Sequence, residues 1–272
     1  MKITFLGGGN MANAIIGGLY QQGFAAAGIQ VVEPVAATRE QLSEAFSVRC
    51  TAAIDAAAIE CDVLVLAVKP QQLRHAVAPL AGKLKQQLVI SIAAGVRLAD
   101  LGRWLGGYAR LVRVMPNTPA LIGAGISGLC AAVGVDSAGR TAAEKILGAV
   151  GQTLWITDEA QMDAITALSG SGPAYVFHFI EALRDAGLEL GLPADAANQL
   201  AIQTMLGAAR LAAQSSDDVA VLRQRVTSKG GTTEAALASM AKDHVKEAII
   251  RAIKAANDRS RALGDELGKD EC

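Results

Sequence analysis

The sequence has little charge of either sign and few aromatic residues. Charged residues make up 19% of the chain, aromatic residues 4%, and the formal net charge at pH 7 is -1. There is no surplus of lysine and arginine to neutralise phosphates, so we expect no nucleic-acid partner. Intrinsic disorder is excluded as well, because the composition is 51% hydrophobic and nearly neutral.

Long apolar runs and clustered cysteines are also missing. No run reaches the ~20 uncharged residues of a membrane span, and the apolar start at residues 3–6 is too short for a signal peptide. Cys50, Cys61, Cys130 and Cys272 stand far apart, without a CxxC spacing or a nearby histidine. That spacing predicts neither a zinc site nor a disulfide framework. We therefore expect no bound metal, no membrane contact and a cytoplasmic location.

Short apolar runs alternate with helical stretches in the first half of the chain. Most runs are continuously apolar, which is typical of parallel strands with both faces buried. The repeated order of strand and helix predicts an open, mostly parallel α/β sheet. The runs occupy residues 2–6, 29–33, 62–68, 87–93, 110–115, 125–131 and 153–156.

The pattern changes after Asp158, beyond which no convincing strand is found. The length suits about two domains, and we predict a dinucleotide-binding domain over residues 1–158 and a helical domain over residues 159–272. Pro173 and Pro193 stand where helix starts tolerate proline. The expected helices cover residues 161–168, 173–190, 194–214, 217–225, 232–241 and 244–267.

The helix expected at residues 194–214 is unusually apolar. Its only charged residues are Asp195 and Arg210, and a helix that is apolar nearly all round is buried on most sides. A small helical domain encloses such a helix with difficulty, which favours an obligate homodimer. The alternative is a helix at the centre of its own bundle.

A strand, a GxGxxA turn and a helix start open the chain. Gly7 permits a tight turn, Gly9 lets the backbone approach a pyrophosphate, and Ala12 lets helix and strand pack closely. The free N–H groups at the helix start then favour phosphate. Because the glycines follow a strand and open a helix, we interpret them as a cofactor site; a purely structural turn is the alternative.

Polar residues follow the next strands. Glu33 ends the second apolar run, where a carboxylate accepts hydrogen bonds from the ribose hydroxyls of NAD and repels the 2′-phosphate of NADP. Arg39 is placed to offset that repulsion, and a solvated strand end is the alternative for Glu33. Lys69 follows the third run and is either a phosphate or substrate contact or a solvated lysine.

Six short strings complete the pattern. They are GGGNMA at 7–12, AVKP at 67–70, SIAAG at 91–95, RVMPNTP at 113–119, LSGSGPAY at 168–175 and VTSKGGTT at 226–233.

In this order, and over essentially the whole chain, these strings resemble the pyrroline-5-carboxylate reductase family. The resemblance implies a Rossmann domain joined to an all-helical dimerisation domain, and dimers that assemble further, commonly into decamers, as pentamers of dimers. It implies reduction of L-Δ1-pyrroline-5-carboxylate to L-proline by NADPH or NADH, the last step of proline biosynthesis. The implied cofactor contacts are Leu6, Gly7, Gly8, Gly9, Asn10, Met11, Ala67, Val68, Lys69, Pro70, Ile92, Ala93 and Ala94.

The resemblance places the substrate loop at Ser228, Gly230, Gly231, Thr232 and Thr233. Successive glycine N–H groups before a helix bind an anion, so we expect them to hold the substrate carboxylate. Thr233 is the candidate to orient the ring nitrogen, with Ser228 beside it as a second catalytic candidate. Plain helix capping is the alternative for the two threonines.

Two positions depart from the family pattern. Many members have a small polar residue where this chain has Glu33, so strict preference for NADPH is in question. Lys229 stands where the family often has proline, which adds either a charge beside the anion site or a surface charge.

For some residues the sequence allows two interpretations. Asn117 and Thr118 follow a strand end, where contact with the nicotinamide and no contact with it are equally compatible with the sequence. The glycine-rich turn at 169–173 either lets the backbone approach a ligand closely or forms a tight link between two helices. Tyr175 and the histidines His75, His178 and His244 are interpreted as packing or surface residues.

Two rival functions remain open. A hydroxyacid dehydrogenase requires a positioned general acid, often lysine or histidine. Between Glu159 and Ser228 the chain has no lysine and one histidine, His178, with no evident acidic partner, which favours imine reduction. A non-catalytic dinucleotide sensor is the second rival, since fold does not determine function.

Overall fold

The structure is a computed structural model that describes residues 1–269. Its contacts divide the chain into two units. The sheet unit comprises residues 1–171 together with the chain from Ala256 onward, and the helical unit comprises residues 172–255. The chain therefore leaves the sheet unit once and returns to it.

The sheet unit is built on one eight-stranded sheet of order β3-β2-β1-β4-β5-β6-β7-β8. Strands β1 to β6 are parallel, β7 is antiparallel to β6, and β8 is parallel to β7. This confirms the predicted mostly parallel α/β sheet. The strands are β1 Ile3–Leu6, β2 Ile29–Val32, β3 Arg49–Thr51, β4 Val63–Leu66, β5 Leu88–Ser91, β6 Leu111–Met115, β7 Gly125–Ala131 and β8 Gly151–Ile156.

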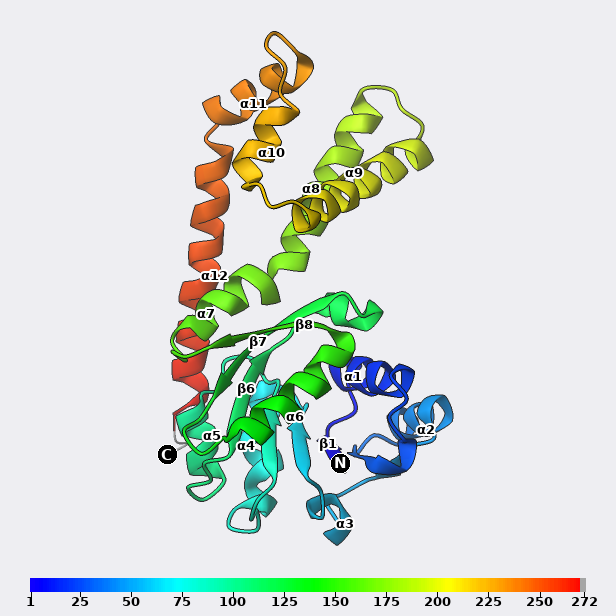
Figure 1. Ribbon diagram of the computed structural model, residues 1–272, viewed down its shortest axis with the longest axis vertical. Helices are drawn as coiled ribbons and strands as arrows, with labels where there is room; N and C mark the ends of the chain where they lie inside the picture. The colour runs from blue at the N-terminus through cyan, green and yellow to red at the C-terminus, as the bar shows by residue number, and fades with distance from the viewer. Residues whose placement is uncertain (270–272) are drawn as a thin grey trace. The chain divides into compact units, whose positions relative to one another are not determined.

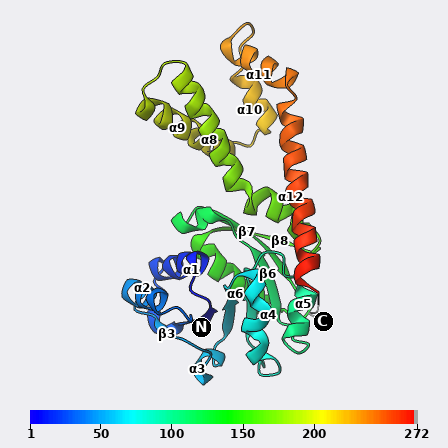
Figure 2. The ribbon, with the colours of Figure 1, turned by 180° about the vertical axis from the view of Figure 1, so that it is seen from behind.

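Helices cover both faces of the sheet, as Figures 1 and 2 show. Along β1, Ile3 and Phe5 belong to one buried cluster and Leu6 to the other, so successive side chains enter different cores. The first core includes residues of α1, α2 and α6, and the second includes residues of α3, α4 and α5. These helices are α1 Asn10–Gln21, α2 Ala36–Phe46, α3 Ala56–Ile59, α4 Pro70–Val77, α5 Leu98–Trp104 and α6 Ser137–Leu147.

One strand is missing from the predicted set. β3 carries Arg49, Cys50 and Thr51, which are exposed or half-buried, and it pairs only with β2. An edge strand of three residues without an apolar run gives no periodic signal. Its place is set by β2, because Arg49 donates a hydrogen bond to the Gln30 side chain at 2.9 Å.

The chain after Glu159 follows the predicted helices closely. Among the described residues after Glu159 there is no strand, and no described helix is long and apolar enough to cross a membrane. α7 Gln161–Ile165 continues as a π-helical turn, Thr166–Gly170, where a helix over 161–168 was expected. The remaining helices are α8 Gly172–Glu189, α9 Ala194–Gln214, α10 Val219–Arg225, α11 Thr232–Lys242 and α12 Val245–Leu267.

Within the single chain, α9 is not buried on most sides. Only Ala197 and Ala201 of this helix are buried, whereas Leu200 and Leu211 are more than half exposed. α9 packs against α8, and no bundle of this chain encloses it among the described residues. The alternative prediction, that residues 194–214 form the central helix of a bundle within one chain, is therefore wrong.

The division by contacts differs from the predicted boundary at residue 158. Met162 and Ala167 are buried with the sheet unit, and Glu159 pairs with Arg113 of β6 at 2.9 Å. The chain from Ala256 also returns to the sheet unit, which no local pattern reveals. The last three residues of the predicted second domain, including Cys272, lie outside the described residues. The assignment of cofactor and substrate to the two parts stays a prediction.

Candidate active site

The glycine turn directly follows β1. Gly7 has a φ of +99°, a conformation that favours glycine, and its N–H donates to the Val32 carbonyl at 2.8 Å. A Cβ at Gly7 would lie 2.7 Å from the Ala67 carbonyl oxygen. Gly7 is thus required both by the turn and by the close approach of the chain after β4.

The amino end of α1 is open. Gly9 is its N-cap, no side chain caps the helix there, and its first turn has no acidic residue. A Cβ on Gly9 would meet no atom within 4 Å, whereas Ala12 beneath it is fully buried. Free N–H groups with space before them suit the pyrophosphate of a dinucleotide.

Three strand ends meet beside this turn. β1 lies between β2 and β4, where the strand order reverses, and ligands of open α/β sheets bind at such a point. The ladder continues past the strands, since the Ala67 N–H donates to the Leu6 carbonyl at 2.8 Å and the Ile92 N–H to the Leu66 carbonyl at 3.1 Å. The predicted cofactor residues after β1, β4 and β5 therefore share one edge of the sheet.

The Glu33 carboxylate is held inside the glycine turn. It accepts hydrogen bonds from the Gly8 N–H at 2.8 Å and from the Val35 N–H at 2.9 Å. The Arg39 guanidinium donates to the Glu33 and Pro34 carbonyls, both at 2.8 Å. Glu33 is therefore a partner of the turn rather than a solvated strand end, and its negative charge stands where the second strand ends.

Lys69 is exposed at the amino end of α4, and Pro70 occupies the first turn of that helix. Asn117 lies beyond the end of β6 and is half-buried. Its side chain accepts a hydrogen bond from the Ile126 N–H at 3.0 Å and donates one to the Ser169 hydroxyl at 3.3 Å. The structure thus joins two motifs that are 52 residues apart in the chain.

The predicted substrate loop leads into α11 in the helical unit. Gly230 has a φ of +73°, and its N–H donates to the Glu234 carboxylate at 2.6 Å. The Gly231 N–H donates to the Ser228 carbonyl at 3.0 Å. Both glycine N–H groups are engaged, so the open donors of this turn are the first N–H groups of α11, from Thr232 onward, where no side chain caps the helix.

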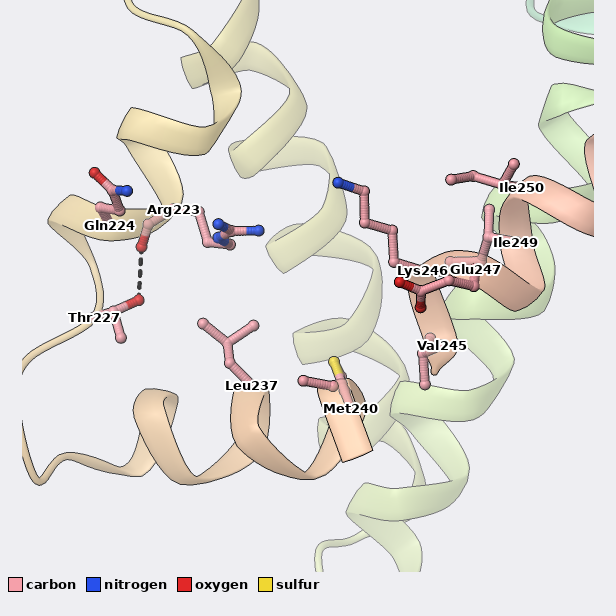
Figure 3. Close-up of a pocket in the computed structure, with 11 residues that line it drawn as sticks. Arg223, Gln224, Thr227, Leu237, Met240, Val245, Lys246, Glu247, Ile249 and Ile250 are labelled. Atoms are coloured by element: carbon pink, nitrogen blue, oxygen red, sulfur yellow. Dashed lines mark hydrogen bonds between the residues drawn. The ribbon is translucent and has the colours of Figure 1, made fainter. Parts of the chain in front are cut away.

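An apolar pocket of about 650 Å³ lies beside this loop in the helical unit. Figure 3 shows Leu237 and Met240 of α11 and Ile250 of α12 among its lining, with the Thr227 hydroxyl donating to the Arg223 carbonyl at 2.7 Å. Its surface is mainly apolar, with the cationic side chains of Arg223 and Lys246 also among the lining.

Sequence reasoning missed two acidic partners. Glu234 was not singled out, although an acid three residues after an N-cap is a known capping signal. Glu159 accepts hydrogen bonds from the Leu98 N–H at 2.8 Å and from the buried Arg113 guanidinium at 2.9 Å. No local signal marks that contact, because its partners are 61 and 46 residues away.

Known proteins match both parts of the chain. Residues 159–263 match the family described as pyrroline-5-carboxylate reductase dimerisation, and residues 2–95 match the family described as NADP oxidoreductase coenzyme F420-dependent. The pyrroline-5-carboxylate reductase of Pseudomonas aeruginosa is 46% identical over 269 residues, which is 98% of each chain.

Solved structures agree. A pyrroline-5-carboxylate reductase from Coxiella burnetii is 42% identical with a TM-score of 0.90, over 96% of this chain and 98% of that one. The Plasmodium falciparum pyrroline carboxylate reductase, solved with NADP bound, is 31% identical with a TM-score of 0.86, over 97% and 98% of the two chains. With its glycine turn at the reversal of the strand order and this similarity over nearly its full length, the chain belongs to the pyrroline-5-carboxylate reductase family.

Proposed function

We propose that this chain reduces L-Δ1-pyrroline-5-carboxylate to L-proline with NAD(P)H, the last step of proline biosynthesis. The observation that carries the proposal is the shared edge of β1, β4 and β5, where an uncapped helix start and open space before Gly9 suit a dinucleotide. The similarity over nearly the whole chain to proteins of that name supports the substrate.

The sheet unit is proposed to hold the cofactor. The turn at Leu6, Gly7, Gly8, Gly9, Asn10 and Met11 receives the pyrophosphate, while residues 67–70, 92–94 and Asn117 line the path towards the nicotinamide. NAD(P)H supplies the hydride, which goes to C5 of the imine while the ring nitrogen takes a proton, giving proline and NAD(P)⁺. Glu33 accepts the ribose hydroxyls and disfavours a 2′-phosphate.

The substrate loop is proposed to hold the pyrroline. The first N–H groups of α11, at Thr232 and Thr233, bind the carboxylate, and the Gly230 N–H joins them once Glu234 has moved aside. Gly231 keeps its hydrogen bond to the Ser228 carbonyl and shapes the turn. Thr233 then orients the ring nitrogen, with Ser228 beside it. Correct orientation of a bound reactant removes up to ~7–11 kcal/mol of a barrier in ideal cases.

The exposed apolar side chains of α9 and the apolar pocket are proposed to be covered by a second copy of the chain. The match to a dimerisation family over residues 159–263 supports a homo-oligomer. A pentamer of dimers and a cytoplasmic location are part of the proposal.

Steady-state kinetics test the function. Purified protein should oxidise NAD(P)H only when pyrroline-5-carboxylate is added, and Thr233→Ala should lower kcat/KM for the pyrroline roughly tenfold or more. Ser239→Ala is the matched control, because it removes an exposed hydroxyl from the same helix. Cofactor binding without turnover would instead support the dinucleotide sensor, and an unchanged kcat/KM would remove Thr233 from the mechanism.

A further inference from the structure

The loop after β5 turns sharply beneath the last part of the chain. It carries Ile92, Ala93 and Ala94, and then turns at Gly95, which is buried and has a φ of +79°. A Cβ at Gly95 would lie 3.1 Å from Leu267 and 3.4 Å from Leu263. The carboxyl end of α12 therefore packs directly on this turn.

A second glycine faces the first from α12. A Cβ at Gly264 would lie 3.2 Å from the Arg97 guanidinium and 3.2 Å from the Gly95 carbonyl oxygen. Gly264 is buried. The two glycines together allow the helix backbone to approach the loop more closely than any pair of larger residues would.

An ion pair also joins the 92–97 loop to α12. The Arg97 guanidinium donates to the Asp265 carboxylate at 2.6 Å and to the Arg261 carbonyl at 3.4 Å. The hydrogen bond that Arg97 donates to Asp265 raises the pKa of Arg97 above its ordinary value. Arg97 is also the N-cap residue of α5, so the pair connects the end of the loop to the last turns of α12.

Other contacts join the elements around the loop to one another. The Ser260 hydroxyl donates to Asp163 of α7 at 2.7 Å, and Arg103 of α5 donates to the Gly268 carbonyl at 2.7 Å. The N–H of Leu98, the first residue of α5, donates to Glu159 at 2.8 Å. The end of α12 is therefore held against α5 and α7 by contacts between residues far apart in the sequence.

We propose that Arg97, Asp265 and Gly264 position the 92–97 loop against the cofactor, so that the last turns of α12 shape the cofactor site through that loop. This inference rests on the proposed function, because that function assigns Ile92, Ala93 and Ala94 to the cofactor. None of the three residues is a catalytic residue, since each acts through the loop. Exposed ion pairs contribute little to stability, whereas small displacements of a binding loop strongly affect a reaction.

The test compares two acidic residues of α12. Asp265→Asn removes the negative charge that pairs with Arg97. The matched control Glu266→Gln removes the neighbouring exposed charge that pairs with Arg259, which lies 2.6 Å away on the same helix. The Kd for NADPH is measured by titration calorimetry, and KM for cofactor and pyrroline, kcat and Tm are measured beside it. Asp265→Asn should raise the Kd and the KM for NADPH roughly threefold to tenfold, with the Tm and the KM for the pyrroline nearly unchanged.

Exchanging the charges of residues 97 and 265 tests whether the ion pair positions the loop or only stabilises the fold. Arg97→Asp alone should weaken NADPH binding, and Arg97→Asp combined with Asp265→Arg should recover at least half of the loss. Equal effects of Asp265→Asn and Glu266→Gln, a Kd that does not change, or no recovery in the double variant would overturn the proposal. Because the Kd requires no turnover, wild-type protein that binds NADPH without reducing the pyrroline contradicts the proposed function alone.

Discussion

The side-chain amide of Asn117 donates a hydrogen bond to the Ser169 hydroxyl at 3.3 Å. The same side chain accepts the Ile126 N–H at 3.0 Å. Asn117 thus joins three segments of the sheet unit: the turn after β6, the start of β7 and the π-helical turn at Thr166–Gly170. π-helical turns are rare and frequently lie at functional sites.

Removing this junction should affect both stability and cofactor use. Asn117→Ala should lower the free energy of unfolding by about 1–2 kcal/mol, since two hydrogen bonds are lost, and Ser169→Ala by about half of that. Urea denaturation measures the difference. Asn117→Ala should also raise the KM for NAD(P)H, and an unchanged KM would contradict the placement of Asn117 at the cofactor, whatever the change in stability.

Glu33 should control the choice of cofactor. Glu33→Ser removes a negative charge that is held on the Gly8 N–H, so the ratio of kcat/KM for NADPH to that for NADH should rise roughly tenfold. Glu44→Ser, which removes an exposed acid from α2, is the control. An unchanged ratio would limit Glu33 to a structural role in the turn.

Glu234 should compete with the substrate carboxylate. Its carboxylate accepts the Gly230 N–H at 2.6 Å, so Glu234→Ala should free that donor and lower the KM for the pyrroline roughly threefold. Glu189→Ala, which removes an exposed acid from α8, should leave the KM as it is. A raised KM for Glu234→Ala would show instead that the capping contact maintains the loop.

The exposed face of α9 should be an interface between two copies of the chain. Leu206 is 40% exposed in the single chain, and Leu206→Asp should shift the protein towards monomer because a buried unpaired charge is costly. Light scattering after gel filtration measures the mass. Gln214→Asp, at the exposed end of the same helix, is the control, and an unchanged mass for Leu206→Asp would exclude this face.

Local patterns were sufficient for most of the fold. Continuous apolar runs predicted seven of the eight strands, because burial on both faces leaves a signal in the sequence itself. The helix starts at Ala194 and Thr232 matched as well. β3 was missed because its three residues are positioned by β2 rather than by their own hydrophobicity.

For the site, the sequence by itself determined the types of residue: glycines for the turn, Glu33 at a strand end and threonines at a helix start. Only the tertiary structure decided their partners. It paired the Glu33 carboxylate with the Gly8 N–H and packed the end of α12 on the turn at Gly95. The physical reason is that turns and helices follow from local sterics and hydrophobic period, whereas the contact between Arg97 and Asp265 joins residues 168 positions apart, which only the packed chain brings together.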